Sequence, residues 1–246
     1  MIAATVHEPA TAERWRHAQE AEREFWADVA TAPATVGAIV QSLSRTAQWA
    51  RERVPVDAGS EWVEIGIGPL GLGVSHFLRA GPGRPRIIGL DPIALDERGT
   101  PLLADPLASL VEHCRSGYQH VVARGERTGL AAGRFSVAFL HNMLDHVEAP
   151  ADVLSETRRL LSPRGHLVLT CDVFSVIGIL KHEHWNRRRR ADSILVRAHP
   201  HRFSYQELVT LISRAGFAVA ATSYVNSGWQ RVGGRVQEVY IHAVAR

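Results

Sequence analysis

The stretch EWVEIGIGPLGLG, residues 61–73, places an acidic residue, an apolar run and four glycines in one short segment. The apolar run predicts a strand, and the glycines predict a tight turn that leads into a helix. Gly66, Gly68 and Gly71 fit the pattern GxGxxG, in which glycines let backbone N–H groups approach a ligand without a Cβ in the way. By itself this pattern is a weak signal, because several classes of nucleotide-binding fold use it.

From residue 61 onward, short apolar runs alternate with helical stretches. The expected strands are residues 61–67, 86–91, 118–123, 135–141 and 166–172. Strands that alternate with helices predict a doubly wound α/β fold with a mostly parallel sheet. The tail contains two further apolar runs, 217–225 and 236–245, with no room for a helix between them. They predict a hairpin that places an antiparallel strand in a seven-stranded sheet.

Three helices are marked by residues at their ends. Asp105 before Pro106 predicts the start of one helix, and Pro150 predicts the start of a second that SPRG at residues 162–165 ends. Ser204 and Glu207 have the spacing of a capping box at the start of a third.

The N-terminal residues 10–54 read as helices with an apolar stripe that includes Trp15, Phe25 and Trp26. We expect a helical cap over residues 1–55 and an α/β domain over residues 56–246. A helix that completes the core is the alternative interpretation of the first segment. The long stretch at residues 172–203 is expected to form a lid or acceptor-pocket insertion.

Composition sets outer limits on the class of protein. The chain has 246 residues, 46% of them hydrophobic, and a formal net charge of +3, which suits one large core. Its dense basic run, Arg187–Arg190, is typical of a solvated loop rather than of a nucleic-acid-binding face. Two cysteines outside any CxxC pair favour a reducing compartment. With no signal-peptide pattern and no apolar run of about 20 residues, we expect a soluble cytoplasmic protein that binds neither nucleic acid nor membrane. The oligomeric state stays open, with a homodimer as one option.

The order and spacing of five segments resemble the class I S-adenosylmethionine-dependent methyltransferases, particularly their broad small-molecule group. The segments are VEIGIGPLG, IIGLDP, ARGERTGL (123–130), FSVAFLHNMLDHVEAP (135–150) and RRLLSPRGHLVLT (158–170). The resemblance covers residues 61 to about 220 and implies a Rossmann-like fold. It departs from the family pattern at Leu70, where the third glycine usually stands, at Ser136, and at the TGL that replaces a leucine-proline.

The resemblance also implies a cofactor, S-adenosylmethionine, and the residues that hold it. Glu64 would assist near the amino group of the cofactor, Asp91 would bind the ribose, and Gly125 with Glu126 would border the adenine. The residues implied to bind the cofactor are Glu64, Gly66, Gly68, Gly71, Asp91, Ile93, Gly125, Glu126, His141 and Asn142.

Methyl transfer from a sulfonium is an in-line displacement, so the protein mainly aligns the two reactants and excludes water. A hydroxyl acceptor also needs a base, for which histidine is suited near neutral pH. His141 is the first candidate for a base or an acceptor-orienting group, and His146 is the second. The candidate acceptor-pocket residues are Phe25, Trp26, His182, His184, Trp185, His199 and His201.

A metal-assisted O-methyltransferase is a competing hypothesis. Asn142, Asp145 and His146 resemble the ligand arrangement of some such enzymes, and a histidine from the 172–203 stretch would complete the site. An asparagine replaces the first carboxylate of that arrangement, so a metal is not the favoured interpretation.

Two other classes of enzyme are disfavoured because the sequence lacks their characteristic motifs. HNML stands where base-modifying DNA methyltransferases and glutamine methyltransferases carry an Asn/Asp-Pro-Pro-aromatic segment. A nicotinamide-dependent oxidoreductase would need a Tyr-x-x-x-Lys pair, and the only lysine is Lys181. A non-catalytic cofactor-binding partner protein stays open, because methyl transfer requires no unique catalytic residue. The leading hypothesis is O-methylation of a small specialised metabolite, with N- or C-methylation as alternatives.

Overall fold

The computed structural model describes residues 10–29, 32–57, 59–78, 85–95, 107–175, 199–225 and 236–246. Its strands are β1 (Glu61–Ile65), β2 (Arg86–Asp91), β3 (Gln119–Val122), β4 (Phe135–His141), β5 (Leu161–Val173), β6 (Phe217–Tyr224) and β7 (Gln237–Ala245). Its helices are α1 (Ala12–Val29), α2 (Pro33–Arg51), α3 (Val74–Leu78), α4 (Leu107–Ser116), α5 (Pro150–Leu160) and α8 (Tyr205–Arg214).

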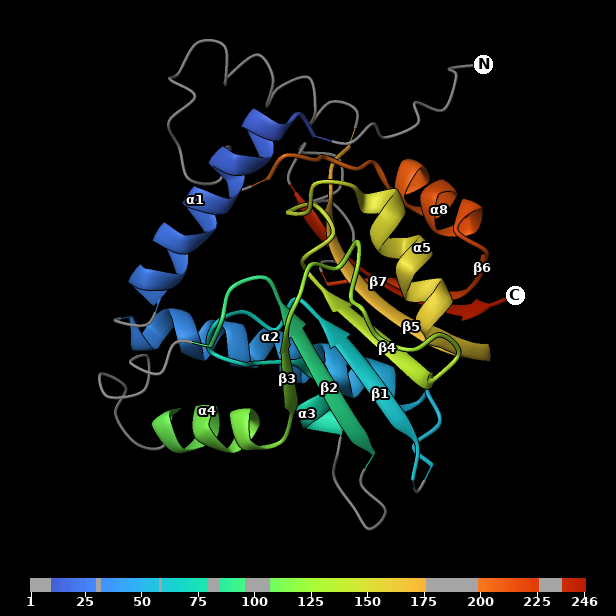
Figure 1. Ribbon diagram of the computed structural model, residues 1–246, viewed down its shortest axis with the longest axis horizontal. Coiled ribbons are helices and arrows are strands. Elements are labelled where there is room, and N and C mark those ends of the chain that lie inside the picture. Colours follow the sequence, from blue (N-terminus) through green and yellow to red (C-terminus); the bar gives the residue numbers. More distant parts are fainter. Residues whose placement is uncertain are drawn as a thin grey trace.

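The seven strands form one sheet in the order β3-β2-β1-β4-β5-β7-β6 (Figure 1). The first five strands pair in parallel, whereas β7 runs antiparallel to both β5 and β6. The predicted doubly wound fold with a C-terminal hairpin is therefore confirmed. Strands β2 and β3 lie on one side of β1, and β4 lies on its other side. The strand order therefore reverses between β1 and β4, and sheets of this kind bind ligands at such a switch point.

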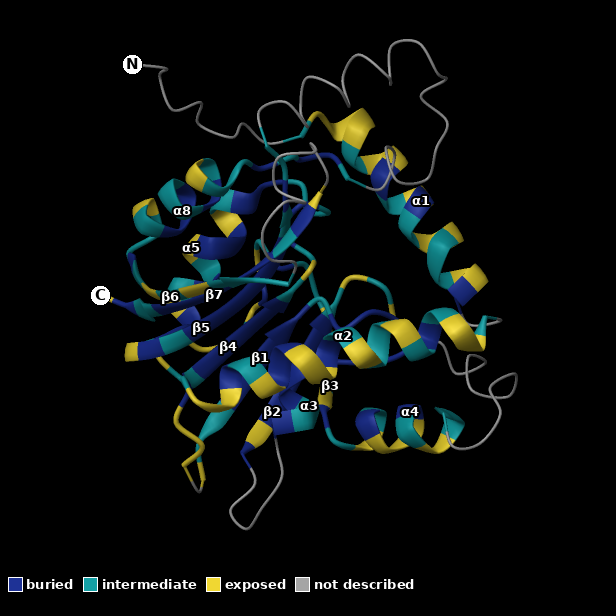
Figure 2. Ribbon diagram, turned by 180° about the vertical axis from the view of Figure 1, so that it is seen from behind, coloured by how far each residue is buried: buried dark blue, intermediate teal, exposed yellow. Residues whose placement is uncertain are grey.

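Two helical layers sandwich the sheet (Figure 2). On one face α2, α3 and α4 pack against Trp62, Ile87 and Phe139, and on the other face α5 and α8 form a second apolar core with the sheet. The central strand β4 (FSVAFLH) is apolar on both sides, as expected of a parallel strand covered on both faces. Because α2 carries buried residues such as Leu43 into the first core, it belongs to the sandwich.

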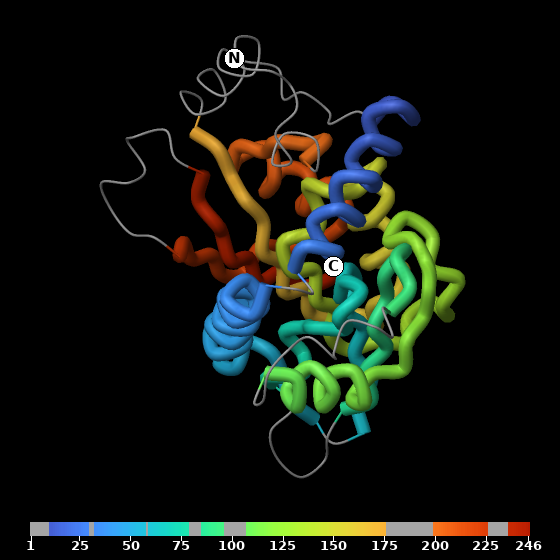
Figure 3. The backbone as a smooth tube through the Cα atoms, turned by 90° about the vertical axis from the view of Figure 1, so that its left-hand side faces the viewer, coloured from blue at the N-terminus to red at the C-terminus, as the bar shows by residue number. Residues whose placement is uncertain are grey.

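Helix α1 differs from the other helices. It extends past the ends of the strands rather than lying flat on the sheet (Figures 1 and 3). Its buried residues are only Ala18, Ala21 and Val29. The domain boundary expected near residue 55 stays a prediction, but only α1 of the two N-terminal helices stands apart from the sheet in this way.

Two local predictions about helix ends are confirmed. The capping box is present: Ser204 accepts a hydrogen bond from the Glu207 N–H, and Glu207 accepts one from the Ser204 N–H. Helix α5 begins at Pro150 and ends at Leu160, directly before the SPRG segment, as predicted. Strand β5 begins at Leu161 and includes this segment. Leu161 pairs with Phe135 and His166 pairs with Val137, so residues 162–165 lie in a register shift of the β4–β5 ladder and have no partner on β4.

Several sequence features lie outside the described residues, namely Asp105, Pro106, Lys181 and Arg187–Arg190. Within the part of the chain that the structure describes, no helix is both long and apolar enough to cross a membrane.

Candidate active site

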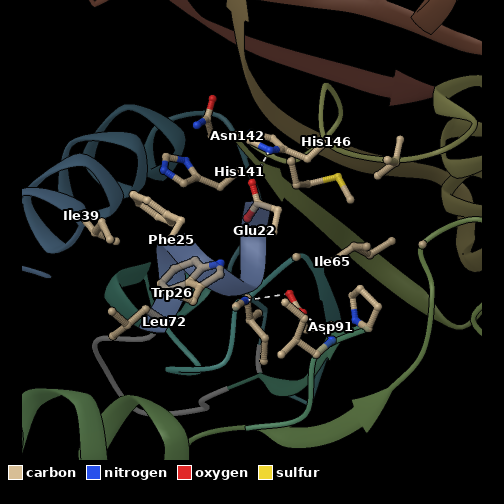
Figure 4. A pocket seen from close by; sticks show the side chains of 18 of the residues that line it. Glu22, Phe25, Trp26, Ile39, Ile65, Leu72, Asp91, His141, Asn142 and His146 are labelled. Carbon is tan, nitrogen blue, oxygen red and sulfur yellow. Dashed lines mark hydrogen bonds and ion pairs between the residues drawn. The ribbon is translucent and has the colours of Figure 1, made fainter. Parts of the chain in front are cut away.

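A cavity of about 530 Å³ opens at the switch point. Ile65, Asp91, His141 and Asp172 reach it from the carboxyl ends of β1, β2, β4 and β5. Glu238 reaches it from the beginning of β7, which lies at the same edge because that strand runs in the opposite direction. Helix α1 closes one side with Trp15, Gln19, Glu22, Phe25 and Trp26, which share one face at helical spacing (Figure 4).

The glycine turn lines the cavity where it was predicted to bind the cofactor. Gly66 has a φ of +85° and Gly68 a φ of +64°, a region that residues with a Cβ rarely adopt. A Cβ on Gly68 would lie 2.7 Å from Cζ2 of Trp26, and one on Gly66 would lie 2.8 Å from Cβ of Met143. Both positions therefore require glycine for conformation and for space.

Asp91 connects the turn to the second strand. Its Oδ2 accepts a hydrogen bond from the Gly68 N–H, and its Oδ1 accepts one from the Ile93 N–H, each at 2.8 Å. Burial raises its pKa to about 6, against the opposing effect of these two hydrogen bonds. The carboxylate is therefore ionised at neutral pH and lies at the cavity wall beside Ile93, and its role in binding the ribose stays a prediction.

Glu64 and Gly71 lie elsewhere than predicted, because neither lines the cavity. The Glu64 carboxylate is buried behind the turn, where it accepts hydrogen bonds from the N–H groups of Val74 and Ser75 at 2.6 and 3.0 Å. Burial raises its pKa. It stabilises the start of α3 and the shape of the turn, and its role near the amino group of the cofactor stays a prediction. Gly71 has a φ of +65°, and a Cβ there would lie 3.0 Å from Cγ of Arg115, away from the cavity.

On the predicted adenine side, Gly125 and Glu126 both line the cavity. Oε1 of Glu126 also accepts hydrogen bonds from the N–H groups of Glu148 and Ala149, at 3.0 and 3.3 Å. Arg124 pairs with Glu126 and stacks 4.2 Å from the ring centroid of Trp15. This contact connects the first turn of α1 to the predicted adenine side of the cavity.

His141 and Asn142 lie at the end of β4, as predicted. Nδ1 of His141 is 2.9 Å from the Thr170 hydroxyl and 3.4 Å from the Thr46 hydroxyl. Burial, followed by the charge of Arg45, lowers the pKa of His141 to about 4. Asn142 has a φ of +46°, and its N–H donates to both oxygens of Thr170 at 3.0 Å. His141 is therefore neutral at pH 7, firmly oriented and only weakly basic.

His146 has the opposite electrostatic environment. Its Nδ1 lies 2.6 Å from Oε1 of Glu22, and its Nε2 lies 3.7 Å from Oδ1 of Asp145. Burial disfavours the charged imidazolium, but the charges of Asp145, Glu22 and Asp172 outweigh burial and raise the pKa to about 9. His146 therefore holds a proton at neutral pH and is a poor proton acceptor in this state.

Sequence reasoning missed three carboxylates in the cavity: Glu22, Asp172 and Glu238. Asp172 and Glu238 are register partners across β5 and β7. Burial and then the charge of Asp145 raise the pKa of Asp172 to about 6, and burial and then the charge of Asp172 raise that of Glu238 to about 7. No local motif marks them, because the pairing joins residues far apart in the chain.

The predicted acceptor-pocket residues divide into three groups. Phe25, Trp26 and His199 line the cavity. His201 does not, because it is buried with Nε2 at 3.0 and 3.1 Å from the carbonyl oxygens of Val147 and Glu148. His182, His184 and Trp185 lie outside the described residues.

A glycine turn and a carboxylate from the next strand, joined at the switch point of a parallel sheet, define a Rossmann-like cofactor-binding protein. The chain belongs to the family described as Methyltransferase domain, whose model matches residues 37–222. Its cofactor is S-adenosylmethionine. The cavity fits this molecule, since Gly66 and Gly68 bring the backbone of the turn to the cavity wall and the Asp91 carboxylate lies beside it. A search of curated proteins found no match.

Solved structures share the fold at low sequence identity. A geranyl diphosphate methyltransferase in complex with its diphosphate and sinefungin is 16% identical, with a TM-score of 0.57 over 82% of this chain and 78% of that chain. The [4+2]-cyclase SpnF is 13% identical, with a TM-score of 0.57 over 82% and 80% of the two chains. A complex of the Haloferax volcanii Trm112 methyltransferase activator with a candidate methyltransferase gives 19% identity and a TM-score of 0.58 over 89% and 96%.

Proposed function

We propose that this methyltransferase transfers the methyl group of S-adenosylmethionine to an oxygen atom of a small, largely apolar acceptor, a specialised metabolite. The observation that carries the proposal is one continuous cavity that extends from the glycine turn and Asp91 to His141 and is lined on one side by the aromatic residues of α1. Trp26 and Phe25 offer apolar contact area, which suits a small organic acceptor.

The protein's part in the reaction would be alignment. The sulfonium supplies an activated methyl group when the cofactor is bound, so the chain must hold the acceptor in line and exclude water. Asp91 and the Gly66–Gly68 turn would fix the cofactor. His141, held by Thr170, would orient the acceptor oxygen.

The Asp172–Glu238 pair is the better candidate for the proton acceptor. With a pKa near 4, His141 is too weak a base, and His146 already carries a proton at pH 7. A general base works best when its pKa lies near the operating pH, and the pKa of about 7 for Glu238 satisfies this condition. Like-charge repulsion between the two carboxylates makes them titrate as a pair.

Binding and transfer are tested separately. Calorimetry with adenosylhomocysteine should show one site per chain, and Asp91→Ala should weaken it by roughly 100-fold because the ribose loses a charged acceptor. Asp57→Ala, at an exposed carboxylate outside the cavity, is the matched control. Incubation with methyl-labelled cofactor and cell extract should then yield a labelled small product. Cofactor binding without any transfer would instead support the cofactor-binding partner protein.

N-methylation is the second candidate, because Glu22, Asp172 and Glu238 give the cavity an acidic wall that suits an ammonium group. A matched set of phenols and amines of equal size separates the two. Methylation of amines alone would overturn O-methylation and leave cofactor binding untouched.

A further inference from the structure

Three side chains converge where the loop after β4 meets the residues that precede α8. Nε2 of His146 lies 3.7 Å from Oδ1 of Asp145, and Nε2 of His199 lies 3.6 Å from Oδ2 of the same carboxylate. The two imidazole centroids are 4.2 Å apart. One ligand atom from each residue lies within 4.8 Å of the others.

Asp145 is the unusual member of this cluster. Its side chain is 1% exposed, yet no nitrogen or oxygen donor among the described residues makes a hydrogen bond to either carboxylate oxygen. The neighbouring Cys171 offers only a thiol, a weak donor, whose pKa is raised well above its usual range by burial and then by the charge of Asp145. Burying a carboxylate is costly unless it is closely paired or coordinated to a metal, and its contacts with His146 and His199 are long, at 3.7 and 3.6 Å.

The separations suit a shared ion better than direct hydrogen bonds. At 3.6 and 3.7 Å the nitrogens are too far from the carboxylate for good hydrogen bonds. Zinc bonds of about 2.0–2.1 Å would place two tetrahedral ligand atoms about 3.4 Å apart. Small side-chain adjustments, with release of the proton that His146 holds in the absence of a metal, would therefore bring all three groups around one ion.

The surroundings also have the features of a metal site. The ring nitrogen of His146 that faces away from Asp145 lies 2.6 Å from Oε1 of Glu22, and metal-bound histidines commonly donate their other N–H to a carboxylate. His201 joins the loop after β4 to the residues before α8. Its backbone N–H donates to the Asp145 carbonyl at 3.2 Å, and its Nε2 contacts the carbonyl of Val147.

We propose that Asp145, His146 and His199 bind a divalent transition-metal ion of the zinc type. Two imidazoles and one carboxylate suit zinc and its neighbours in the first transition row, whereas magnesium and calcium prefer oxygen ligands. Asn142, which the sequence grouped with these residues, is not needed for the three-ligand set. His199 supplies the ligand that the sequence could assign only to one of several histidines.

The ion would serve the acceptor half of the cavity. His146 and His199 line the cavity, so an ion between them would meet a molecule bound there. The role of the ion in catalysis, unlike its binding, rests on the proposed O-methylation. In that reaction the ion would bind the acceptor oxygen and lower the pKa of the acceptor hydroxyl.

The test is metal binding itself. Protein dialysed against a chelator is titrated with Zn²⁺ and, separately, with Mg²⁺ by calorimetry. Co²⁺ is added to a further sample to record the visible spectrum of the site. We expect one Zn²⁺ per chain, with Asp145→Asn and His199→Ala each weakening it by roughly 100-fold or more and Glu22→Gln by about tenfold. Mg²⁺ should bind more weakly than Zn²⁺, and the Co²⁺ absorption should be lost in Asp145→Asn.

The matched control is a second imidazole pair. Nδ1 of His166 lies 2.9 Å from Nε2 of His242, outside the cavity, and this pair offers a site for adventitious zinc. His166→Gln should leave the high-affinity site intact. Adenosylhomocysteine affinity, unchanged in Asp145→Asn, reports that the variant is folded.

Two results would overturn the inference: wild-type zinc affinity equal to that of Asp145→Asn, or loss of the site in His166→Gln. Tighter binding of Mg²⁺ than of Zn²⁺ would overturn the choice of metal. If the protein binds adenosylhomocysteine but not zinc, the metal site is refuted and the proposed function stands. If it binds zinc but not adenosylhomocysteine, only the proposed function is refuted.

Discussion

The two halves of the cavity are built in different ways. The cofactor half is local: Gly66, Gly68 and Asp91 come from two successive strands and are fixed by backbone hydrogen bonds. The acceptor half joins α1, the ends of β4, β5 and β7, and the residues before α8, and side-chain charges dominate it. The comparison teaches that one half is specified by backbone conformation and the other by tertiary convergence of ionisable groups.

The largest effect should come from adding a methyl group to the cofactor half. Gly68→Ala and Gly129→Ala both place an alanine at a positive φ, +64° and +73°, so both should lower stability by about 1–2 kcal/mol. Only the Cβ at residue 68 would collide with Trp26, since nothing lies within 4 Å of one at residue 129. We expect roughly 100-fold weaker adenosylhomocysteine binding in Gly68→Ala alone, measured by calorimetry.

Equal affinity in the two glycine variants would show that space at the turn does not limit cofactor binding. The contrast between a conformationally specified half and a charge-specified half would then fail.

A smaller effect is expected from the acceptor half, where Glu238 has a pKa of about 7. Below that pH the carboxyl holds a proton, so the methyl-transfer rate should fall as pH drops through about 7. Glu238→Gln leaves Asp172, whose pKa is about 6, as the remaining carboxylate of the pair, so the acidic limb should move to lower pH, with a rate about tenfold lower. The charge of Arg45 and hydrogen bonds with Thr170 and Ser42 act against burial and lower the pKa of Glu238.

The same pKa has a consequence for stability. A folded-state pKa above the ordinary 4.5 of glutamate means that ionisation destabilises the fold as pH rises through 7. Glu238→Gln should therefore raise the thermal midpoint at pH 8 and have little effect at pH 4. Glu112→Gln, at an exposed position on α4, should change neither the pH–rate profile nor the thermal midpoint. An unmoved profile in Glu238→Gln would remove the carboxylate pair from the mechanism.

The smallest effect is expected from Thr170, which joins the two halves. Its hydroxyl contacts Nδ1 of His141 and accepts from the Asn142 N–H. Thr170→Val deletes both of these hydrogen bonds and the one to Glu238 at constant volume, and should lower kcat by roughly five- to tenfold, with adenosylhomocysteine affinity unchanged. Thr170→Ser keeps the hydroxyl and should keep the rate. A uniform loss of cofactor affinity in the valine variant would place His141 with the cofactor half instead.

Prediction from sequence succeeded where the signal was periodic or conformational. Alternating apolar runs predicted the sheet and its antiparallel hairpin, and the glycine pattern predicted the turn. The order of the family motifs located Asp91 and His141 at the strand ends. The prediction for Glu64 was less accurate, because a carboxylate before the glycines suits either a ligand or a helix start, and only the positions of Val74 and Ser75 distinguish the two.

The sequence by itself determined the order of strands and helices, the glycine turn and the carboxylate after the second strand. These depend on side-chain period and local backbone conformation, which neighbouring residues dictate. Only the tertiary structure decided that Asp172 faces Glu238, that Glu22 meets His146, and that His199 joins Asp145. The physical reason is that their ionisation and coordination depend on burial and on charges brought from distant segments, and no local pattern encodes either.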